Sequence, residues 1–158
     1  MRVKDIMTMD PDCCTPVTVA TKAARIMKEE NVGLVPVVDS ESGRKVVGVV
    51  TDRDLCLAVV AAGQHPDSVL VRDAMMAKNI VTCRPEDDLE KVINCMRENQ
   101  IRRVPIVDTE GKLRGIVSIA DILQHSDLPS GTTHETLKTI SEPSEHASRP
   151  RAQTQRAA

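Results

Sequence analysis

A glycine, a hydroxyl side chain and an aspartate recur at one spacing in two places along the chain. The sets are Gly48, Thr51, Asp54 and Gly115, Ser118, Asp121. Glycine lets the end of a strand run close to a ligand, because no Cβ blocks the approach. The hydroxyl can donate to a phosphate or ribose oxygen, and a carboxylate can accept from two ribose hydroxyls at once. This chemistry suits the recognition of a nucleoside.

The same residues also have an ordinary structural explanation. Thr51 and Ser118 are typical N-cap residues, and an aspartate three residues later completes a capping box. For one copy alone, capping is the more frequent explanation. The second copy brings ligand binding closer to capping as an explanation, but duplication by itself would also repeat a cap. Both interpretations stay open at this point.

The elements around these residues are repeated too, at an offset that drifts from 69 to 67 residues. Val35 to Asp39 returns as Val104 to Asp108, and Val3 to Met7 returns as Val71 to Met75. A duplicated unit that cannot close its own core predicts two halves packed about a pseudo-twofold axis. Equivalent clefts are then expected between the halves.

Each copy predicts the element order β-α-β-β-α, an α/β fold. A short extended stretch (13–15; 80–83) precedes a helix with apolar residues at i, i+3, i+4 and i+7. Two β-branched runs then predict a hairpin, and a second helix begins near the hydroxyl residue. Asp87 and Glu90 are spaced as a capping box for the first helix of the second copy. The apolar helix positions are Ala20, Ala23, Ala24, Met27 and Leu89, Val92, Ile93, Met96; the hairpin runs are 34–38, 46–50 and 104–107, 113–117.

The predicted organisation is repeat 1 over residues 1–62, a linker over 63–70, repeat 2 over 71–125 and a tail over 126–158. The linker is marked by Gly63 and Pro66. The tail is rich in Ser, Thr and Pro and lacks apolar periodicity, so we expect it to be disordered.

Composition narrows the classes of function. The chain has 158 residues, a net charge of −2 and no Phe, Tyr or Trp, so a flat ligand would be held between aliphatic side chains and proline. The charge gives no general attraction to nucleic acid or anionic lipid. No apolar run approaches the roughly 20 residues of a membrane span, and the first residues do not resemble a secretion signal. We therefore expect a soluble, cytoplasmic protein.

The five cysteines show no Cys-x-x-Cys spacing, which indicates reduced thiols. Adjacent Cys13 and Cys14 leave a zinc or redox role open, beside the simpler interpretation of small buried side chains. No P-loop, His-Glu-x-x-His or G-x-S-x-G motif occurs, and no histidine is placed as a base for a nucleophile. We expect no catalysis, no required cofactor and no metal.

The repeats resemble CBS domains, the cystathionine β-synthase-type repeat, and the pair resembles a Bateman module. The resemblance spans residues 1 to about 125. It is carried by Asp5-Ile6-Met7, Val35-Pro36-Val37-Val38-Asp39 and Gly48 to Asp54, and by their partners Arg72 to Met75, Arg102 to Asp108 and Gly115 to Leu123. It implies two clefts for adenine nucleotides (AMP, ADP, ATP or related compounds) between the repeats.

The resemblance also implies which residues line each cleft. One cleft would combine Ser118 and Asp121 with Thr8, Cys13, Val32, Gly33 and Pro36. The other would combine Thr51 and Asp54 with Ile80, Val81, Arg102 and Pro105. Arg102-Arg103 stands where the first copy has Gly33-Leu34, and Arg53 lies nearby, so only the Thr51 cleft gains guanidinium groups suited to phosphate. The alternative for Arg103 is that it faces solvent or pairs with Glu98. We expect the Thr51 cleft to bind more tightly.

Two functions follow from this resemblance. The first is a regulatory module that binds an adenine nucleotide and signals through homodimer geometry or through an effector protein that the sequence does not identify. The alternative is a structural or stress-associated dimerisation protein with vestigial clefts. The helix faces expected to form the homodimer comprise Ala20, Ala23, Ala24, Leu55, Leu57, Ala58 and Val59.

Overall fold

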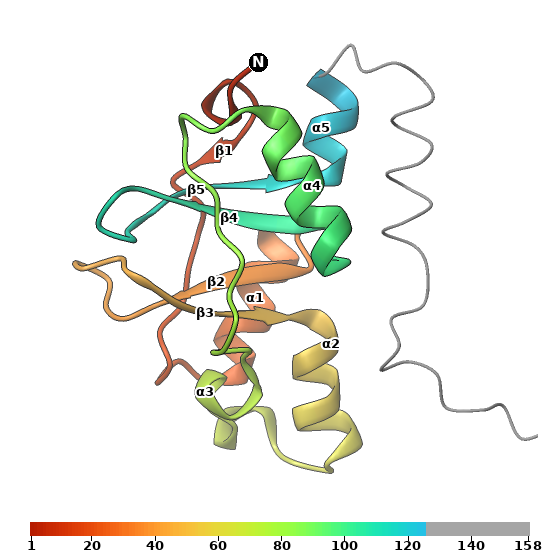
Figure 1. The fold of residues 1–158 in the computed structure, drawn as a ribbon. Coiled ribbons are helices and arrows are strands. Elements are labelled where there is room, and N and C mark those ends of the chain that lie inside the picture. The colour runs from red at the N-terminus through yellow and green to blue at the C-terminus, as the bar shows by residue number, and fades with distance from the viewer. Residues whose placement is uncertain (126–158) are drawn as a thin grey trace, which may run out of the picture.

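The computed structural model describes residues 1–125, so the predicted disordered tail, 126–158, lies outside the described residues. Each repeat supplies one antiparallel hairpin (Figure 1). In repeat 1, β2 (Leu34–Val38) pairs with β3 (Val46–Thr51), with Val35 opposite Val50. In repeat 2, β4 (Arg103–Val107) pairs with β5 (Leu113–Ser118), with Val104 opposite Val117. The predicted hairpins are confirmed.

The first helix of each repeat packs its apolar stripe onto its hairpin. These helices are α1 (Ala20–Glu29) and α4 (Leu89–Asn99). All four predicted positions of α4 are buried, and Ala20, Ala23 and Met27 are buried in α1, whereas Ala24 is exposed. The small side chains of Ala20 and Ala23 let the first turns of α1 lie close to the core that they cover.

The capping box predicted for α4 is wrong. The N-cap is Asp88, and no side chain caps the helix there. Asp87 instead accepts from the backbone N–H of Arg84 at 2.8 Å and pairs with Lys91 at 2.8 Å. Its carboxylate therefore closes the preceding turn and is not available to the helix start.

The second helix begins at the predicted residue in both repeats. α2 (Asp52–Leu55) has Thr51 as its N-cap and continues as one π-helical segment, η2 (Cys56–Ala61). α5 (Ile119–His125) follows Ser118. Two short turns, η3 (Pro66–Ser68) and α3 (Val71–Ala74), then lead into repeat 2. Among residues 1–125, no helix is long and apolar enough to cross a membrane.

The expected first strand of each repeat is reduced to a single bridge. Cys14 pairs in parallel with Val37, and Cys83 pairs in the same way with Ile106. Pro16 and Pro85 follow within two residues, and proline has no N–H to continue a ladder. The stretches 13–15 and 80–83 are therefore extended, but they are not regular strands.

The segment that opens each repeat, which we call its lead-in (3–9 in repeat 1 and 71–76 in repeat 2), packs on the other repeat. After the turn η1 (Val3–Asp5), β1 (Thr8–Met9) pairs with β5, and Met76 pairs with Val49 of β3 in the equivalent position. Val3 N–H donates to the carbonyl of Asp87, and Val71 N–H donates to the carbonyl of Thr18. Residues from the start of one sequence repeat thus complete the sheet and core of its sibling.

The two apolar cores reflect this exchange. Val3 and Ile6 belong to the core built on α4 and its hairpin, whereas Val69 and Val71 belong to the core built on α1. Ala20, Ala23 and Leu55 are buried inside the second of these cores. These three residues therefore offer little surface to a partner, although Ala20 and Leu55 line an apolar groove near exposed Leu57, and the dimer face stays a prediction.

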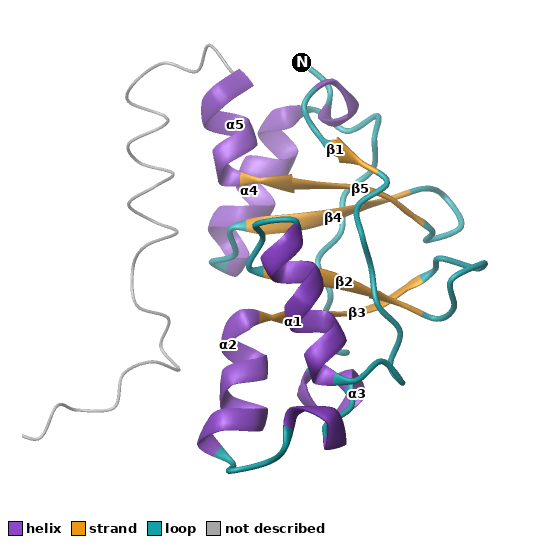
Figure 2. Cartoon of the chain, turned by 180° about the vertical axis from the view of Figure 1, so that it is seen from behind, coloured by secondary structure: helices purple, strands orange, loops and turns teal. Residues whose placement is uncertain are grey.

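The two repeats are joined directly at their hairpin turns. Val46 N–H donates to the carbonyl of Gly111 at 3.0 Å, and Leu113 N–H donates to the carbonyl of Arg44 at 2.8 Å. In Figures 1 and 2 the turns lie on one side of the molecule, and α1, α2, α4 and α5 lie toward the other. The result is two α/β repeats about a pseudo-twofold axis, as expected.

The exchange of lead-ins predicts a stability effect. Val3 is 0% exposed in the core of the other repeat, so Val3→Ala should lower the free energy of unfolding by about 1.5–3 kcal/mol. Val17→Ala makes the same change at a side chain that is 65% exposed and should have an effect of less than about 0.5 kcal/mol. Urea denaturation followed by circular dichroism measures both, since the chain has no Trp or Tyr for fluorescence. Equal effects of the two substitutions would show that the N-terminal segment is not part of this core.

Candidate functional site

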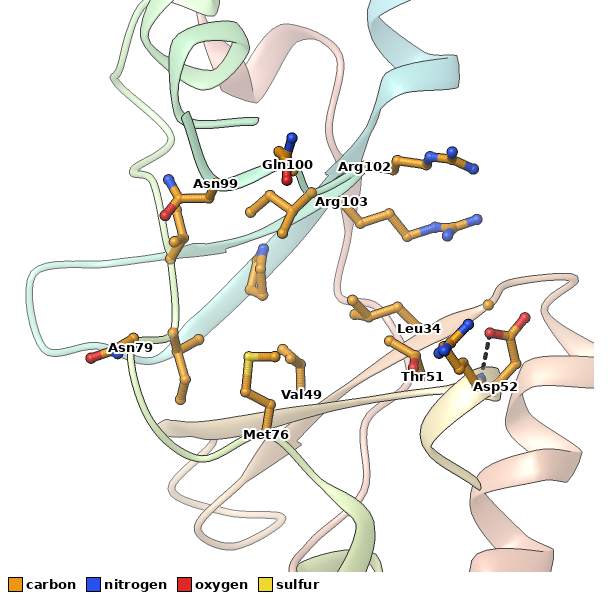
Figure 3. Close-up of a pocket in the computed structure, with 16 residues that line it drawn as sticks. Leu34, Val49, Thr51, Asp52, Met76, Asn79, Asn99, Gln100, Arg102 and Arg103 are labelled. Carbon is orange, nitrogen blue, oxygen red and sulfur yellow. Dashed lines mark hydrogen bonds between the residues drawn. The ribbon is translucent and has the colours of Figure 1, made fainter. Parts of the chain in front are cut away.

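A cleft of about 890 Å³ lies between the two hairpins and includes Thr51 in its wall. Repeat 1 lines it with Gly33, Leu34, Val49, Thr51, Asp52 and Arg53; repeat 2 lines it with Met76, Asn79, Ile80, Val81, Asn99, Gln100, Ile101, Arg102, Arg103 and Pro105. Figure 3 shows that Arg102 and Arg103 extend toward the end of the cleft where Thr51 and Asp52 lie, with Asn79 and Asn99 at the other end. The cleft thus has a charged end and an amide end, joined by aliphatic walls.

Thr51 and Asp54 form a reciprocal cap at the start of α2. The carboxylate Oδ2 of Asp54 accepts from the Thr51 N–H at 2.9 Å and from the Thr51 hydroxyl at 2.7 Å. The Thr51 Oγ1 in turn accepts from the Asp54 N–H at 3.2 Å. The capping interpretation is confirmed. The cap also fixes the Thr51 hydroxyl in the wall of the cleft. Its proton is donated to Asp54, so the hydroxyl keeps one lone pair with which to accept from a ligand hydroxyl.

Several predicted residues come together in this wall. Thr51, Arg53, Ile80, Val81, Arg102, Arg103 and Pro105 all line the cleft. Asp54 is not one of the lining residues, because its carboxylate is turned to Thr51. The contact of the seven lining residues, and of Asp54, with a ligand stays a prediction.

Gly33 also lines the Thr51 cleft, whereas the resemblance assigned it to the other one. The reason is local pairing. Leu34 lies opposite Thr51 in the hairpin, and the carbonyl of Gly33 accepts from the N–H of Asp52 at 3.2 Å. The start of β2 is thereby held beside the start of α2.

Sequence reasoning missed Asp52 and the amide side chains of Asn79, Asn99 and Gln100. Asn79 and Gln100 have left-handed backbone conformations, with φ of 54° and 52°. Asn tolerates this region well, so an Asn directly before the Ile80-Val81 stretch was a usable signal for the turn that presents this wall. Nothing in the sequence alone placed Gln100 beside it.

Ser118 and Asp121 repeat the cap in repeat 2. The Asp121 Oδ2 accepts from the Ser118 N–H and from its hydroxyl, both at 2.7 Å. Thr8 pairs with Ile116, two residues before Ser118, so the lead-in of repeat 1 does reach this region. Pro36 is buried, and its carbonyl accepts from the N–H of Cys14.

The repeat equivalence changes the expected lining of the Ser118 cleft. Asp10 and Asn79 share a left-handed backbone, and Cys14 and Cys83 share the parallel bridge. Pro11 and Asp12 are therefore the counterparts of Ile80 and Val81. Cys13 is the counterpart of Thr82, which does not line the Thr51 cleft. Val32 is the counterpart of Ile101, which lines the Thr51 cleft, so its place in the Ser118 cleft stays a prediction.

The adjacent cysteines face different surroundings. Cys14 is buried, and burial raises the pKa of its thiol to about 12; burial also raises the pKa of the half-buried Cys13. Both thiols are therefore mainly protonated at neutral pH, which disfavours nucleophilic attack. In the described part of the chain, no three His, Cys, Asp or Glu side chains lie close enough together to hold a metal ion.

The comparison with known families agrees with this architecture. The family of the CBS domain matches the chain twice, over residues 3–61 and 71–127. The chain belongs to the CBS domain family.

Relatives and solved structures extend this match. The uncharacterized protein YlbB of Bacillus subtilis is 39% identical over 89% of this chain and 92% of its own length. The CBS domain pair of protein MJ0100, solved with 5′-methylthioadenosine and S-adenosyl-L-methionine, has a TM-score of 0.69 and 29% identity over 78% of this chain and 94% of that one. CBSX2, solved with AMP, has a TM-score of 0.66 and 27% identity over 78% and 94%. CBS pairs similar to this one therefore bind adenosyl compounds.

The thiol environments predict a reactivity order. At pH 8, iodoacetamide should modify exposed Cys56 first and the buried Cys14 and Cys83 last, because a thiol with a pKa of about 12 is only about one part in 10,000 thiolate at this pH. Mass spectrometry of tryptic peptides gives the order, and unfolding in urea should make the rates similar. Labelling of Cys14 as fast as Cys56 in the folded chain would contradict the burial of this thiol.

Proposed function

We propose that this chain is a non-catalytic regulatory module that binds an adenosyl nucleotide in the Thr51 cleft. The observation that carries the proposal is the cleft itself, because both repeats line it and it places a hydroxyl, three arginines and three amide side chains around aliphatic walls. A volume of about 890 Å³ lies in the range typical of small-molecule sites. The adenosyl ligands of the MJ0100 and CBSX2 pairs support the class of ligand.

The walls suit a purine base despite the absence of aromatic residues. Val49, Ile80, Ile101 and Pro105 provide flat apolar surface on two sides of the cleft. The amides of Asn79 and Asn99 lie at the end away from the arginines (Figure 3) and can both donate to and accept from a base edge. A nucleoside with its base at this end would direct its 5′ side toward Thr51.

Binding in this position would act on the relation between the repeats. A ligand shifts a conformational equilibrium only by its different affinity for the two states. Because residues of both hairpins line the cleft, a ligand there favours the arrangement in which the two walls stay close. The signal then passes to another copy of the chain or to an effector protein.

Substitution of Asp54 tests the site. Asp54→Ala removes the carboxylate that we propose as a charged acceptor for a ribose hydroxyl, and we expect it to weaken nucleotide binding by about 1.5–3 kcal/mol, which is roughly 10- to 150-fold. Asp121→Ala removes the same cap in repeat 2 and should cost about 1 kcal/mol of folding stability, as Asp54→Ala does, with little change in affinity. Titration calorimetry with AMP, ADP and ATP measures the affinities.

A thermal-shift screen comes first. A ligand present at a hundred times its dissociation constant stabilises the folded chain by about 2.7 kcal/mol. The absence of any shift with AMP, ADP, ATP, 5′-methylthioadenosine or S-adenosyl-L-methionine would reject the proposed function and favour a dimerisation protein with vestigial clefts.

We further propose that output passes through a homodimer. Leu57 and Val60 on η2 are 52% and 74% exposed, next to an apolar groove that includes Ala24 and Val59. Light scattering should give twice the chain mass of 17.3 kDa, and Leu57→Glu should return it to one chain. Val17→Glu, a matched change at another exposed apolar residue, should leave the mass unchanged. A single-chain mass for the unmodified protein at all concentrations would contradict the homodimer.

A further inference from the structure

The charged end of the Thr51 cleft carries positive charge that the chain does not neutralise. Arg53, Arg102 and Arg103 lie there with a single carboxylate, that of Asp52, so the lining holds two net positive charges. Within residues 1–125, none of these three guanidinium groups takes part in an ion pair or a side-chain hydrogen bond. The arginine–glutamate pair considered for Arg103 and Glu98 is not formed.

Of the other arginines among residues 1–125, only Arg2 and Arg114 form ion pairs, and Arg25, Arg72, Arg84 and Arg97 form none. Arg114 contacts Asp108 through two nitrogens at 2.8 and 3.0 Å, and Arg2 contacts Asp88 at 3.1 Å. The lack of an ion pair is therefore common among these arginines, and what sets Arg53, Arg102 and Arg103 apart is that all three line one cleft beside a single carboxylate. An anion is the group that this end of the cleft lacks.

Gly33 makes room for this arrangement. A Cβ built on Gly33 would lie 3.0 Å from Oδ2 of Asp52 and 3.5 Å from Nη1 of Arg103. The guanidinium group of Arg103, from repeat 2, therefore lies next to the backbone of Gly33, from repeat 1, where there is no side chain. Asp52 is held by its other oxygen, which accepts from the Arg53 N–H at 2.7 Å.

The positions equivalent to these three arginines around Ser118 carry no positive charge. Ile119 N–H donates to the Arg102 carbonyl as Asp52 N–H donates to the Gly33 carbonyl, which fixes the equivalence of these segments. The counterparts of Arg53, Arg102 and Arg103 are therefore uncharged. They are Ala120, Gly33 and Leu34.

The residues that the repeat equivalence assigns to the opposite wall near Ser118 show the complementary change. Asn31 of repeat 1 and Gln100 of repeat 2 both have a left-handed φ of 52°. Asp10 and Asn79 also share a left-handed backbone, so the segments around these residues can be aligned residue by residue between the repeats. The counterparts of Asn79, Val81 and Asn99 are Asp10, Asp12 and Glu30. Three neutral positions of the Thr51 cleft are thus carboxylates in its sibling, where they would repel a phosphate.

We propose that the two clefts differ in the charge of the ligand that they accept. The Thr51 cleft selects 5′-phosphorylated adenosine compounds over the uncharged 5′-methylthioadenosine and the cationic S-adenosyl-L-methionine, with Arg53, Arg102 and Arg103 as the specificity-determining residues. The Ser118 cleft rejects phosphate, so one chain binds one nucleotide. This inference rests on the proposed function and adds the ligand charge and the stoichiometry to it.

The test compares two ligands that share adenosine and differ at the 5′ position. Titration calorimetry of the full chain with AMP and with 5′-methylthioadenosine should show AMP at least tenfold tighter, at one molecule per chain. Arg103→Gln should weaken AMP about 10- to 100-fold, the usual range for a charge-assisted hydrogen bond, and leave 5′-methylthioadenosine within about twofold. Raising the salt concentration should weaken AMP only.

Two variants control this comparison. Arg25→Gln removes the same charge from an exposed position of α1 and should leave both ligands unchanged. Arg102→Gln repeats the test should Arg103→Gln lower the melting temperature. Equal binding of both ligands, with neither glutamine variant affecting AMP, would overturn charge selection while adenosyl binding stands. Two AMP molecules per chain would overturn the asymmetry, whereas binding of neither ligand would reject the proposed function itself.

Discussion

The exchange of lead-in segments is the constraint on which the rest of the structure depends. Each repeat has only a hairpin and two helices, which is too little to bury an apolar sheet alone. Val3 of repeat 1 is fully buried in the core of repeat 2, and Val71 of repeat 2 is fully buried in the core of repeat 1. Neither core is complete without a segment from the other sequence repeat. The two repeats are therefore expected to unfold together, and the pseudo-twofold arrangement is fixed by covalent connection as well as by packing.

This interlock explains why a cleft persists between the hairpins. At the turn end the hairpins touch through the backbone, with Lys45 bridged to Lys112. At the helix end each strand finishes at a hydroxyl cap, and Gly33 and Arg103 meet across the gap. Each wall is anchored in a complete core, which favours a cleft that is formed before a ligand binds. A preformed site of this kind requires little ordering before binding.

Much of the fold could be predicted because duplication doubles every signal. The hairpins, the apolar faces of α1 and α4 and the caps at Thr51 and Ser118 all follow from local periodicity and local hydrogen bonding. The exchanged lead-ins could not be predicted in this way, since pairing between Thr8 and Ile116 is a contact between distant residues that local pattern does not encode. The same limit applies to the site. Thr51 and Arg102 were found from their types, whereas Gln100 and the correct place of Gly33 depend on tertiary geometry.

The comparison of the two repeats also separates what packing requires from what a ligand would require. Core positions have the same character in both copies, as in Val35 and Val104 or Val50 and Val117, because each must fill the same space between a helix and a hairpin. The positions around the clefts differ in charge although their backbones correspond. Packing does not demand this difference, because Arg102 is exposed and Arg103 is only half-buried. A structural role alone explains the caps, the glycines and the apolar residues of both repeats, but it gives no reason for three unpaired arginines to converge on one side of the pseudo-twofold axis.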